Sequence, residues 1–148
     1  DKTELGSAKI RAIKEFEDNA GNTKVFSVGN NKILSGTTTL VDETPAAVTI
    51  TSDNWKMVNF NDKIYFFQRS NEPLVYDAVG GAVIKLSAVS GAAGVTSAMY
   101  GNEVLAAYGR LWTADFTHTR VHTHTLLNMI KYYYSSHGYE TASAHTEH

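Results

Sequence analysis

Residues 57–67 read Met-Val-Asn-Phe-Asn-Asp-Lys-Ile-Tyr-Phe-Phe, and this stretch decides the fold. Two apolar runs flank Asn61-Asp62, a pair that is typical of a tight turn between antiparallel strands. In the return strand, Ile64 and Phe66 point to one side, while Tyr65 and Phe67 point to the other. Apolar side chains on both sides predict a sheet that is covered on both faces.

The same pattern of strands and turns continues to residue 86. Ser70-Asn-Glu-Pro73 predicts a turn, Leu74-Val-Tyr-Asp77 a strand, Gly80-Gly81 a second turn and Val83-Ile-Lys-Leu86 a last strand. We therefore expect a four-stranded antiparallel meander over 55–86, which is the unit of one blade in a β-propeller.

Two further stretches, 25–34 and 99–108, repeat the plan of strand, turn and strand. Aligned on the apolar residue after each turn, Ile33, Ile64 and Val104 lie 31 and then 40 residues apart. This alignment places the third turn at Gly101-Asn102, before a strand over 104–108, and residues 109–115 predict another turn and strand after it. The spacing suits propeller blades. Three units are fewer than usually close a propeller, so we expect either an open sandwich or a ring completed by other sequence.

The N-terminal part predicts one more hairpin. A turn at Asn19-Ala-Gly-Asn22 lies between 9–17 and 23–28, and we favour pairing of these two runs over a short helix at 8–17. Residues 37–41 have β-branched character and predict a short strand. Pro45 then breaks the ladder, because proline has no N–H to donate.

The composition divides the chain into two parts. Residues 1–115 form the predicted propeller-like domain of about three blade units, with a small-residue connection at 87–96. Residues 116–148 form a tail that holds all six histidines, and we expect it to be irregular or partly helical. Within it, 126–134 is compatible with a helix or a buried strand. Since the chain begins at Asp1, we expect it to be a piece of something longer.

The composition of the chain excludes several classes of function. There are 13 basic and 15 acidic residues, so no basic face predicts tight binding of nucleic acid. There is no cysteine, which excludes disulfides and thiolate metal sites. No apolar run approaches the length of about 18 residues that predicts a membrane-spanning helix.

Three histidines in the tail, His118, His122 and His124, are the candidate metal ligands. They share parity, so on a strand they would project from one face and offer nitrogen ligands to Zn²⁺ or Ni²⁺. Alternating Thr and His also make a plain exposed strand. No Asp or Glu between Phe116 and Tyr139 would orient the imidazole rings, so we favour the exposed strand and expect no metal.

Aromatic residues offer two further candidate surfaces. A sugar-binding platform would use Trp55, Tyr65, Tyr76, Tyr108 and Trp112, although aromatic residues on strands more often pack between sheets. Tyr132, Tyr133 and Tyr134 are the interface candidates, because three adjacent rings on a strand cannot all point inward.

The sequence contains no recognisable catalytic arrangement. Glu15 and Glu17 share a strand face, and Asp42-Glu43 precedes a turn, but neither pair has the apolar setting that would separate two pKa values. Gly91-Ala-Ala-Gly94 lacks the Lys-Ser/Thr of a phosphate-binding loop. We therefore expect no enzyme activity and no cofactor.

One long stretch resembles a known family. Asn54-Trp-Lys-Met-Val-Asn-Phe-Asn-Asp-Lys-Ile-Tyr-Phe-Phe67, then Gln68-Arg69, then Glu72-Pro-Leu-Val-Tyr-Asp77, is similar to the propeller-like domain of tail proteins from short-tailed bacteriophages. Residues 101–115 fit the same pattern one blade later. The family is the tail nozzle, or tail tubular protein B, of podoviruses, in particular those of marine cyanobacteria, and the resemblance covers residues 7 to 115.

The resemblance implies a virion structural protein in the phage tail. Members of the family form a ring of identical subunits through which DNA leaves the capsid, and they carry no catalytic residues. The implied partners are copies of the chain, neighbouring tail proteins and passing DNA bound without sequence specificity. The alternative is a carbohydrate- or receptor-binding β module of a phage or bacterial surface protein. A metal-dependent role for the tail is a third hypothesis.

Overall fold

The computed structural model describes residues 9–51, 53–68, 71–89, 101–116 and 131–134. Within these ranges the chain is built of antiparallel strands with a single short 3₁₀ turn, η1 (Leu86–Ala88), which confirms the predicted all-β class. The strands are β1 (Ala12–Glu17), β2 (Thr23–Gly29), β3 (Lys32–Ser35), β4 (Val41–Asp42), β5 (Lys56–Phe60), β6 (Lys63–Phe67), β7 (Leu74–Asp77), β8 (Ala82–Lys85), β9 (Gly101–Ala107), β10 (Arg110–Phe116) and β11 (Lys131–Tyr134).

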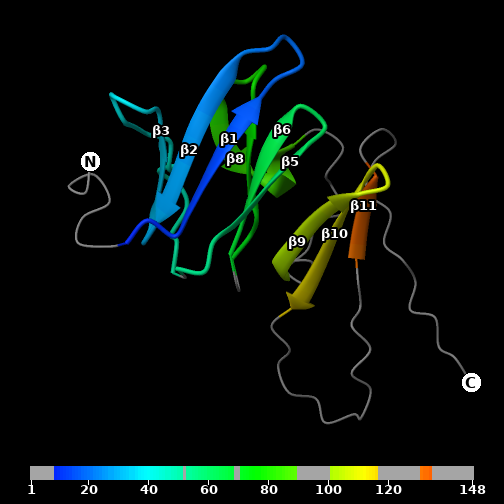
Figure 1. Cartoon of the computed structure of the whole chain (residues 1–148). Coiled ribbons are helices and arrows are strands. Elements are labelled where there is room, and N and C mark those ends of the chain that lie inside the picture. Colours follow the sequence, from blue (N-terminus) through cyan, green and yellow to red (C-terminus); the bar gives the residue numbers. More distant parts are fainter. Residues whose placement is uncertain (1–8, 52, 69–70, 90–100, 117–130, 135–148) are drawn as a thin grey trace, which may run out of the picture.

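The strands form three sheets, each a meander in which strands adjacent in sequence are also hydrogen-bonded neighbours (Figure 1). The first sheet has the order β1-β2-β3-β4, the second β5-β6-β7-β8 and the third β9-β10-β11. The predicted pairing of 9–17 with 23–28 is confirmed, since Ala12 is in register with Val28 and Glu17 with Thr23. The predicted four-stranded meander over 55–86 is also confirmed.

Tight turns with positive φ join several of the strands. Asn30, Asn61 and Asp62 adopt φ values of 52°, 49° and 59°. Asn and Asp tolerate this left-handed region better than other side chains, which is why these pairs mark the turns in the sequence. The third sheet places Tyr108 at a φ of 54° in the equivalent turn, followed by Gly109 at 69°.

Two of the predicted boundaries are wrong. Gly101-Asn102 does not turn the chain but begins β9. The further turn and strand predicted over 109–115 are confirmed, as the turn at Tyr108-Gly109 and β10. The alternating run after Gly101 pairs with 110–116 in a register that leaves only residues 108 and 109 to connect the strands. The predicted strand at 37–41 is reduced to Val41–Asp42, because Gly36, at a φ of 108°, turns the chain away first.

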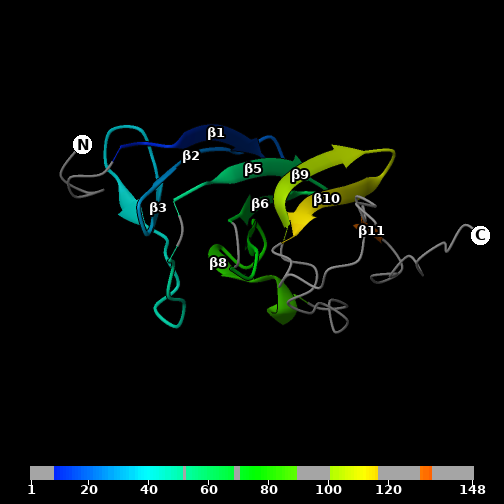
Figure 2. The ribbon, with the colours of Figure 1, turned by 90° about the horizontal axis from the view of Figure 1, so that it is seen from below.

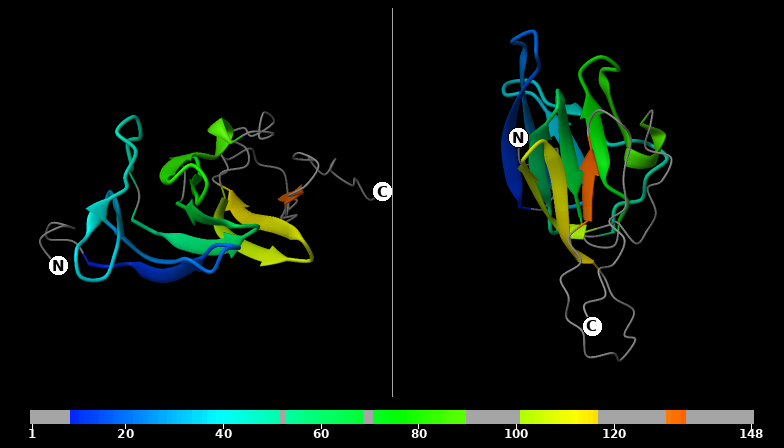
Figure 3. Two further views of the ribbon diagram at one scale, coloured as in Figure 1. Left: turned by 90° about the horizontal axis from the view of Figure 1, so that it is seen from above. Right: turned by 90° about the vertical axis from the view of Figure 1, so that its right-hand side faces the viewer.

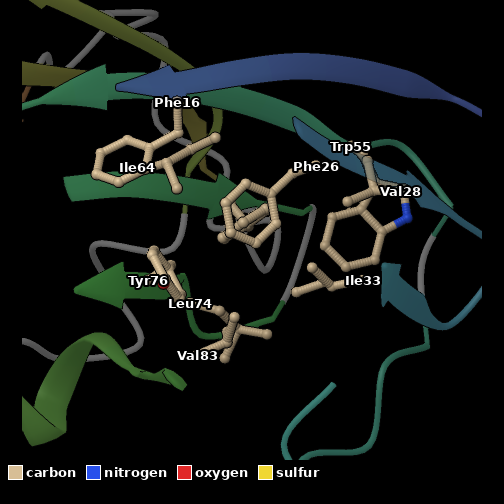
Figure 4. Close-up of a cluster of buried hydrophobic side chains, with 10 residues drawn as sticks. Phe16, Phe26, Val28, Ile33, Trp55, Ile64, Leu74, Tyr76 and Val83 are labelled. Carbon is tan, nitrogen blue, oxygen red and sulfur yellow. The ribbon is translucent and has the colours of Figure 1, made fainter. Parts of the chain in front are cut away.

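The three sheets stack face to face, with an apolar cluster between each neighbouring pair. The larger cluster lies between the first and second sheets, and its side chains point toward one another in Figure 4. It comprises Phe16, Phe26, Val28, Ile33, Trp55, Ile64, Phe66, Leu74, Tyr76 and Val83. The smaller cluster, between the second and third sheets, comprises Tyr65, Phe67, Val75, Leu86 and Leu111.

Strand β6 supplies side chains to both clusters. Ile64 and Phe66 belong to the larger cluster, whereas Tyr65 and Phe67 belong to the smaller one. The prediction that the second sheet is covered on both faces is therefore confirmed. Because successive side chains of a strand alternate between faces, one uninterrupted apolar run can hold three layers together.

The first strands of the three sheets lie side by side. β5 contacts β1 on one side and β9 on the other, and Figures 2 and 3 show β1, β5 and β9 along one edge of the stack. The later strands of each sheet lie farther from this edge. The arrangement gathers the first strand of every unit on a common surface.

Candidate functional site

The common surface formed by β1, β5 and β9 is the candidate functional site, and we call it the first-strand surface. Polar contacts between its sheets define it: Arg11, Glu15, Asn19, Asp53, Asn54, Lys56, Asn59, Asp62, Asn102 and Glu103. The two partners in each of these contacts lie up to 48 residues apart in sequence.

Asp53 joins the first sheet to the second at one end of this surface. Both Nε and Nη2 of Arg11 lie 2.5 Å from Asp53 Oδ2. The other carboxylate oxygen accepts the backbone N–H of Asn30 at 2.7 Å. The Asn30 carbonyl in turn accepts the indole N–H of Trp55 at 3.2 Å. One carboxylate therefore fixes the start of β1, the β2–β3 turn and the approach to β5.

Two further hydrogen bonds join these sheets along β5 and at its far end. The Asn59 side-chain amide donates to the backbone carbonyl of Glu15 at 2.8 Å. The Asn19 N–H donates to Asp62 Oδ1 at 2.7 Å, so the β1–β2 turn contacts the β5–β6 turn. Both bonds satisfy backbone groups of β1 and its turn that the first sheet itself leaves unpaired at an edge.

The β1–β2 turn is braced by a carboxylate. Asp18 accepts hydrogen bonds from the side chain of Asn22 and from the backbone N–H groups of Ala20 and Asn22. These bonds stabilise the charged carboxylate, and the Asn22 side chain contributes most to holding the pKa of Asp18 below its ordinary value of 3.8.

The second and third sheets are joined by one ion pair and one amide pair. Lys56 Nζ lies 3.2 Å from Glu103 Oε1, and both side chains are exposed. Beside them, the Asn54 side chain donates to the side-chain oxygen of Asn102. The pattern at the previous junction recurs here, because a cation of the earlier sheet again meets a carboxylate at the start of the next.

Two of the cations on this surface are ion-paired, Arg11 with Asp53 and Lys56 with Glu103, whereas Lys14 on β1 has no ion pair within the described residues. Three further pairs lie elsewhere on the first two sheets: Lys24–Glu43, Lys32–Asp42 and Lys63–Asp77. Tight binding of DNA depends on cations that face the phosphates. On the first-strand surface Arg11 and Lys56 already face carboxylates, which weakens the electrostatic attraction of this surface for a polyanion.

A partly buried polar cluster closes the far side of the larger apolar core. Glu43 Oε1 lies 2.6 Å from Lys24 Nζ and accepts the Ser35 hydroxyl at 2.6 Å. The Lys24 ammonium also lies 4.6 Å from the centre of the Tyr76 ring. Burial lowers the pKa of Lys24, but Glu43 and Tyr76 raise it more, so it stays above the ordinary value of 10.5. The cluster holds β2 and the segment after β4 against the second sheet.

The carboxylate pairs considered in the sequence do not form a joint site. Glu15 and Glu17 are exposed on one face of β1, as predicted. Asp42 and Glu43 have separate partners, since Asp42 lies 3.2 Å from Lys32 Nζ and also accepts the Thr44 N–H. Burial raises the pKa of Asp42, but Thr44 and Lys32 lower it more, to below 3.8.

The five aromatic residues of the suggested sugar platform do not come together. Trp55 and Tyr76 lie in the larger cluster and Tyr65 in the smaller one, all three buried. Trp112 is half-buried on the third sheet and donates its indole N–H to the Ala107 carbonyl at 3.0 Å. Tyr108 is 91% exposed at a turn. The packing role that the sequence favoured is thus confirmed for the three buried rings.

Of the candidate residues in the tail, the structure describes the three tyrosines and not the three histidines. His118, His122 and His124 lie outside the described residues. Among the residues that are described, no group of three His, Cys, Asp or Glu side chains is placed to hold a metal ion. Tyr132, Tyr133 and Tyr134 belong to β11, whose backbone pairs with β10, with Tyr132 in register with Trp112. This part of 126–134 is therefore a strand, and the interface role of the tyrosines stays a prediction.

The residues that join the sheets were not singled out in the sequence. Asp53 and Asn59 act across 42 and 44 residues of chain, and no pattern marks either for this role, although Asn59 lies within the stretch 57–67. The one available signal was their position just before or within the strand that opens the second unit.

Comparison of the chain with protein-family models, with curated proteins and with solved structures gave no match. In the part of the chain that the structure describes, no helix has the length and apolar character needed to cross a membrane.

Proposed function

We propose that this chain is a propeller segment of a virion structural protein, belonging to the nozzle of a short phage tail. In that role it forms part of the wall of a conduit for DNA ejection. Its partners are further copies of itself, neighbouring tail proteins and passing DNA that is not bound by sequence. It needs no cofactor and performs no catalysis.

The observation that carries the proposal is the alignment of β1, β5 and β9 along one edge of a stack of meanders. In a propeller, sheets of this kind are arranged around a central channel. Three stacked units with their first strands on one edge are the arrangement expected of an arc of such a ring. The resemblance of 54–77 and 101–115 to tail nozzle proteins supports the same role.

The charges of the first-strand surface suit a conduit. A channel lined by free lysines would retain DNA, because each neutralised phosphate adds to the affinity. Here Arg11 and Lys56 are each paired with a carboxylate of the neighbouring sheet. The wall therefore lets a polyanion pass, and its rigidity comes from the two apolar clusters behind it.

Negative-stain electron microscopy of the purified chain tests the proposal. Rings or tail-like particles are the expected result. A monomer that binds glycans, with quenching of Trp112 fluorescence by sugars, would overturn the proposal in favour of a carbohydrate-binding module. Retention of duplex DNA at physiological salt by the wild-type chain would contradict the conduit mechanism.

A further inference from the structure

The stack of three sheets ends in two faces that no other sheet covers. On the first sheet this outer face carries Ile13, which is 63% exposed, and the half-buried Val25. Both point away from the larger cluster, because the alternate residues Phe16 and Phe26 point into it. Leu34 lies on the same face and is already buried. We call this the leading face.

The third sheet has the corresponding outer face at the other end of the stack. Leu105 on β9 is 61% exposed and stands in register with the half-buried Trp112. Their strand neighbours Val104 and Leu111 point the other way, into the smaller cluster. We call this the trailing face.

In the second sheet, both faces are packed against a neighbouring sheet. Its strand β5 turns Met57 toward the larger cluster and Val58 toward the smaller one, and both are partly buried there. Each junction joins the trailing side of one sheet to the leading side of the next. The interface is therefore of the head-to-tail kind, which can repeat without limit or close into a ring.

We infer that a second copy of this chain stacks its leading face on the trailing face of the first. The contact would place Ile13 and Val25 of one copy against Leu105 and Trp112 of the other. This continues the junction already made twice within the chain, and it removes two exposed apolar groups from water. The inference rests on the proposed function, since it names the contact that would join identical subunits.

The turns at one end of the sheets support this arrangement. Within the chain, Asn19 of the β1–β2 turn touches Asp62 of the β5–β6 turn in the next sheet. The equivalent turn of the third sheet holds Tyr108, at a φ of 54° and 91% exposed. A bulky side chain is unfavourable at this φ, where Asn30 and Asn61 serve in the other turns. In the stacked pair, Tyr108 would lie beside the 18–22 turn of the second copy.

Sedimentation velocity over a range of protein concentrations tests the inference with two variants, Ile13→Lys and Leu105→Lys. Each places an ammonium at the centre of one face, so each variant alone should self-associate more than about tenfold more weakly than the wild-type chain. Val79→Lys is the matched control, since Val79 is 91% exposed and lies in the β7–β8 turn, away from both faces. Circular dichroism establishes that all three variants are folded.

Mixing the two variants identifies the faces. Ile13→Lys keeps an intact trailing face and Leu105→Lys an intact leading face, so an equimolar mixture should form a one-to-one dimer that neither variant forms alone. A variant that dimerises alone shows like faces in contact and overturns the inference, as does a wild-type chain that stays monomeric. Rings that persist in both variants overturn it while leaving the nozzle proposal standing. A monomer with glycan affinity removes both.

Discussion

Replacing Phe26 tests how the first two sheets are held together. The ring is fully buried and comes from β2 in the first sheet, but its aromatic contacts lie in the second. Its centre is 5.4 Å from the Phe66 ring in an edge-on arrangement at 73°, and 5.0 Å from the Tyr76 ring at 58°. A substitution at this one position therefore weakens the junction and not only one sheet.

The expected loss can be worked from this environment. Truncation of a buried phenylalanine to alanine costs about 3–5 kcal/mol, through lost burial and the cavity that remains. Each aromatic pair accounts for about 0.5–1.5 kcal/mol of such a loss. Phe26→Leu keeps most of the volume but loses both pairs, so we expect about 1–3 kcal/mol. For a domain of this size, the alanine variant should lower the melting temperature by about 6–20 °C.

Urea unfolding provides the measurement. Trp55 lies in the same cluster, so its fluorescence reports the junction directly, and circular dichroism reports the strands. Val79→Ala, at an exposed turn, is the control and should change stability by less than about 0.5 kcal/mol. A double-mutant cycle with Phe66→Leu should give a coupling of about 0.5–1.5 kcal/mol. A loss below about 1 kcal/mol for Phe26→Ala would refute the packing described here.

Three further predictions concern polar groups and a turn. Glu43→Gln leaves Lys24 without its ionic partner and should cost about 1.5–3 kcal/mol in urea unfolding, whereas the same change at the exposed Glu103 should cost less than about 1 kcal/mol. The pKa of Lys24 is raised in the folded state, so the stability contributed by its ion pair should be complete below pH 10.5 and should disappear as the pH rises through the folded pKa. A loss of stability in Glu43→Gln that does not change with pH would contradict this. Tyr108→Asn should raise stability by about 0.5–1 kcal/mol by relieving the strained φ, and a lower melting temperature would count against the turn geometry. Asp18→Ala should destabilise the chain at pH 6 but less and less as the pH falls below 3.8, because the pKa of Asp18 is depressed in the folded state; equal effects at pH 6 and pH 3 would argue against the bracing role.

Local patterns in the sequence predicted most of the strands and the layering. The run Ile64 to Phe67 is apolar at every position, which only a strand covered on both faces accommodates, and both clusters bear this out. Asn61-Asp62 predicted its turn because these residues tolerate positive φ. The same rule placed a turn wrongly at Gly101-Asn102, which begins β9, whereas the turn predicted at Gly109 is found at Tyr108-Gly109.

The candidate surface could not be predicted in the same way. Its contacts join residues such as Asp53 and Arg11, or Asn59 and Glu15, that lie more than 40 residues apart. Short polar side chains in loops carry no periodic signal, and their role depends on which strands the stacking brings together. The order of the sheets followed from the repeats, whereas the junctions between them became visible only in three dimensions.

The stacking also has consequences for how such a chain folds during synthesis and how it evolves. In the described part of the chain, the main contacts between sheets join the first to the second and the second to the third, so stability is distributed along the chain one junction at a time. A single meander leaves an apolar face in water, and the smallest piece able to shield Phe26 is a pair of them. During synthesis on the ribosome, the first meander therefore cannot bury its apolar face until the second has emerged. Gene duplication can lengthen the array without disturbing the units already in place.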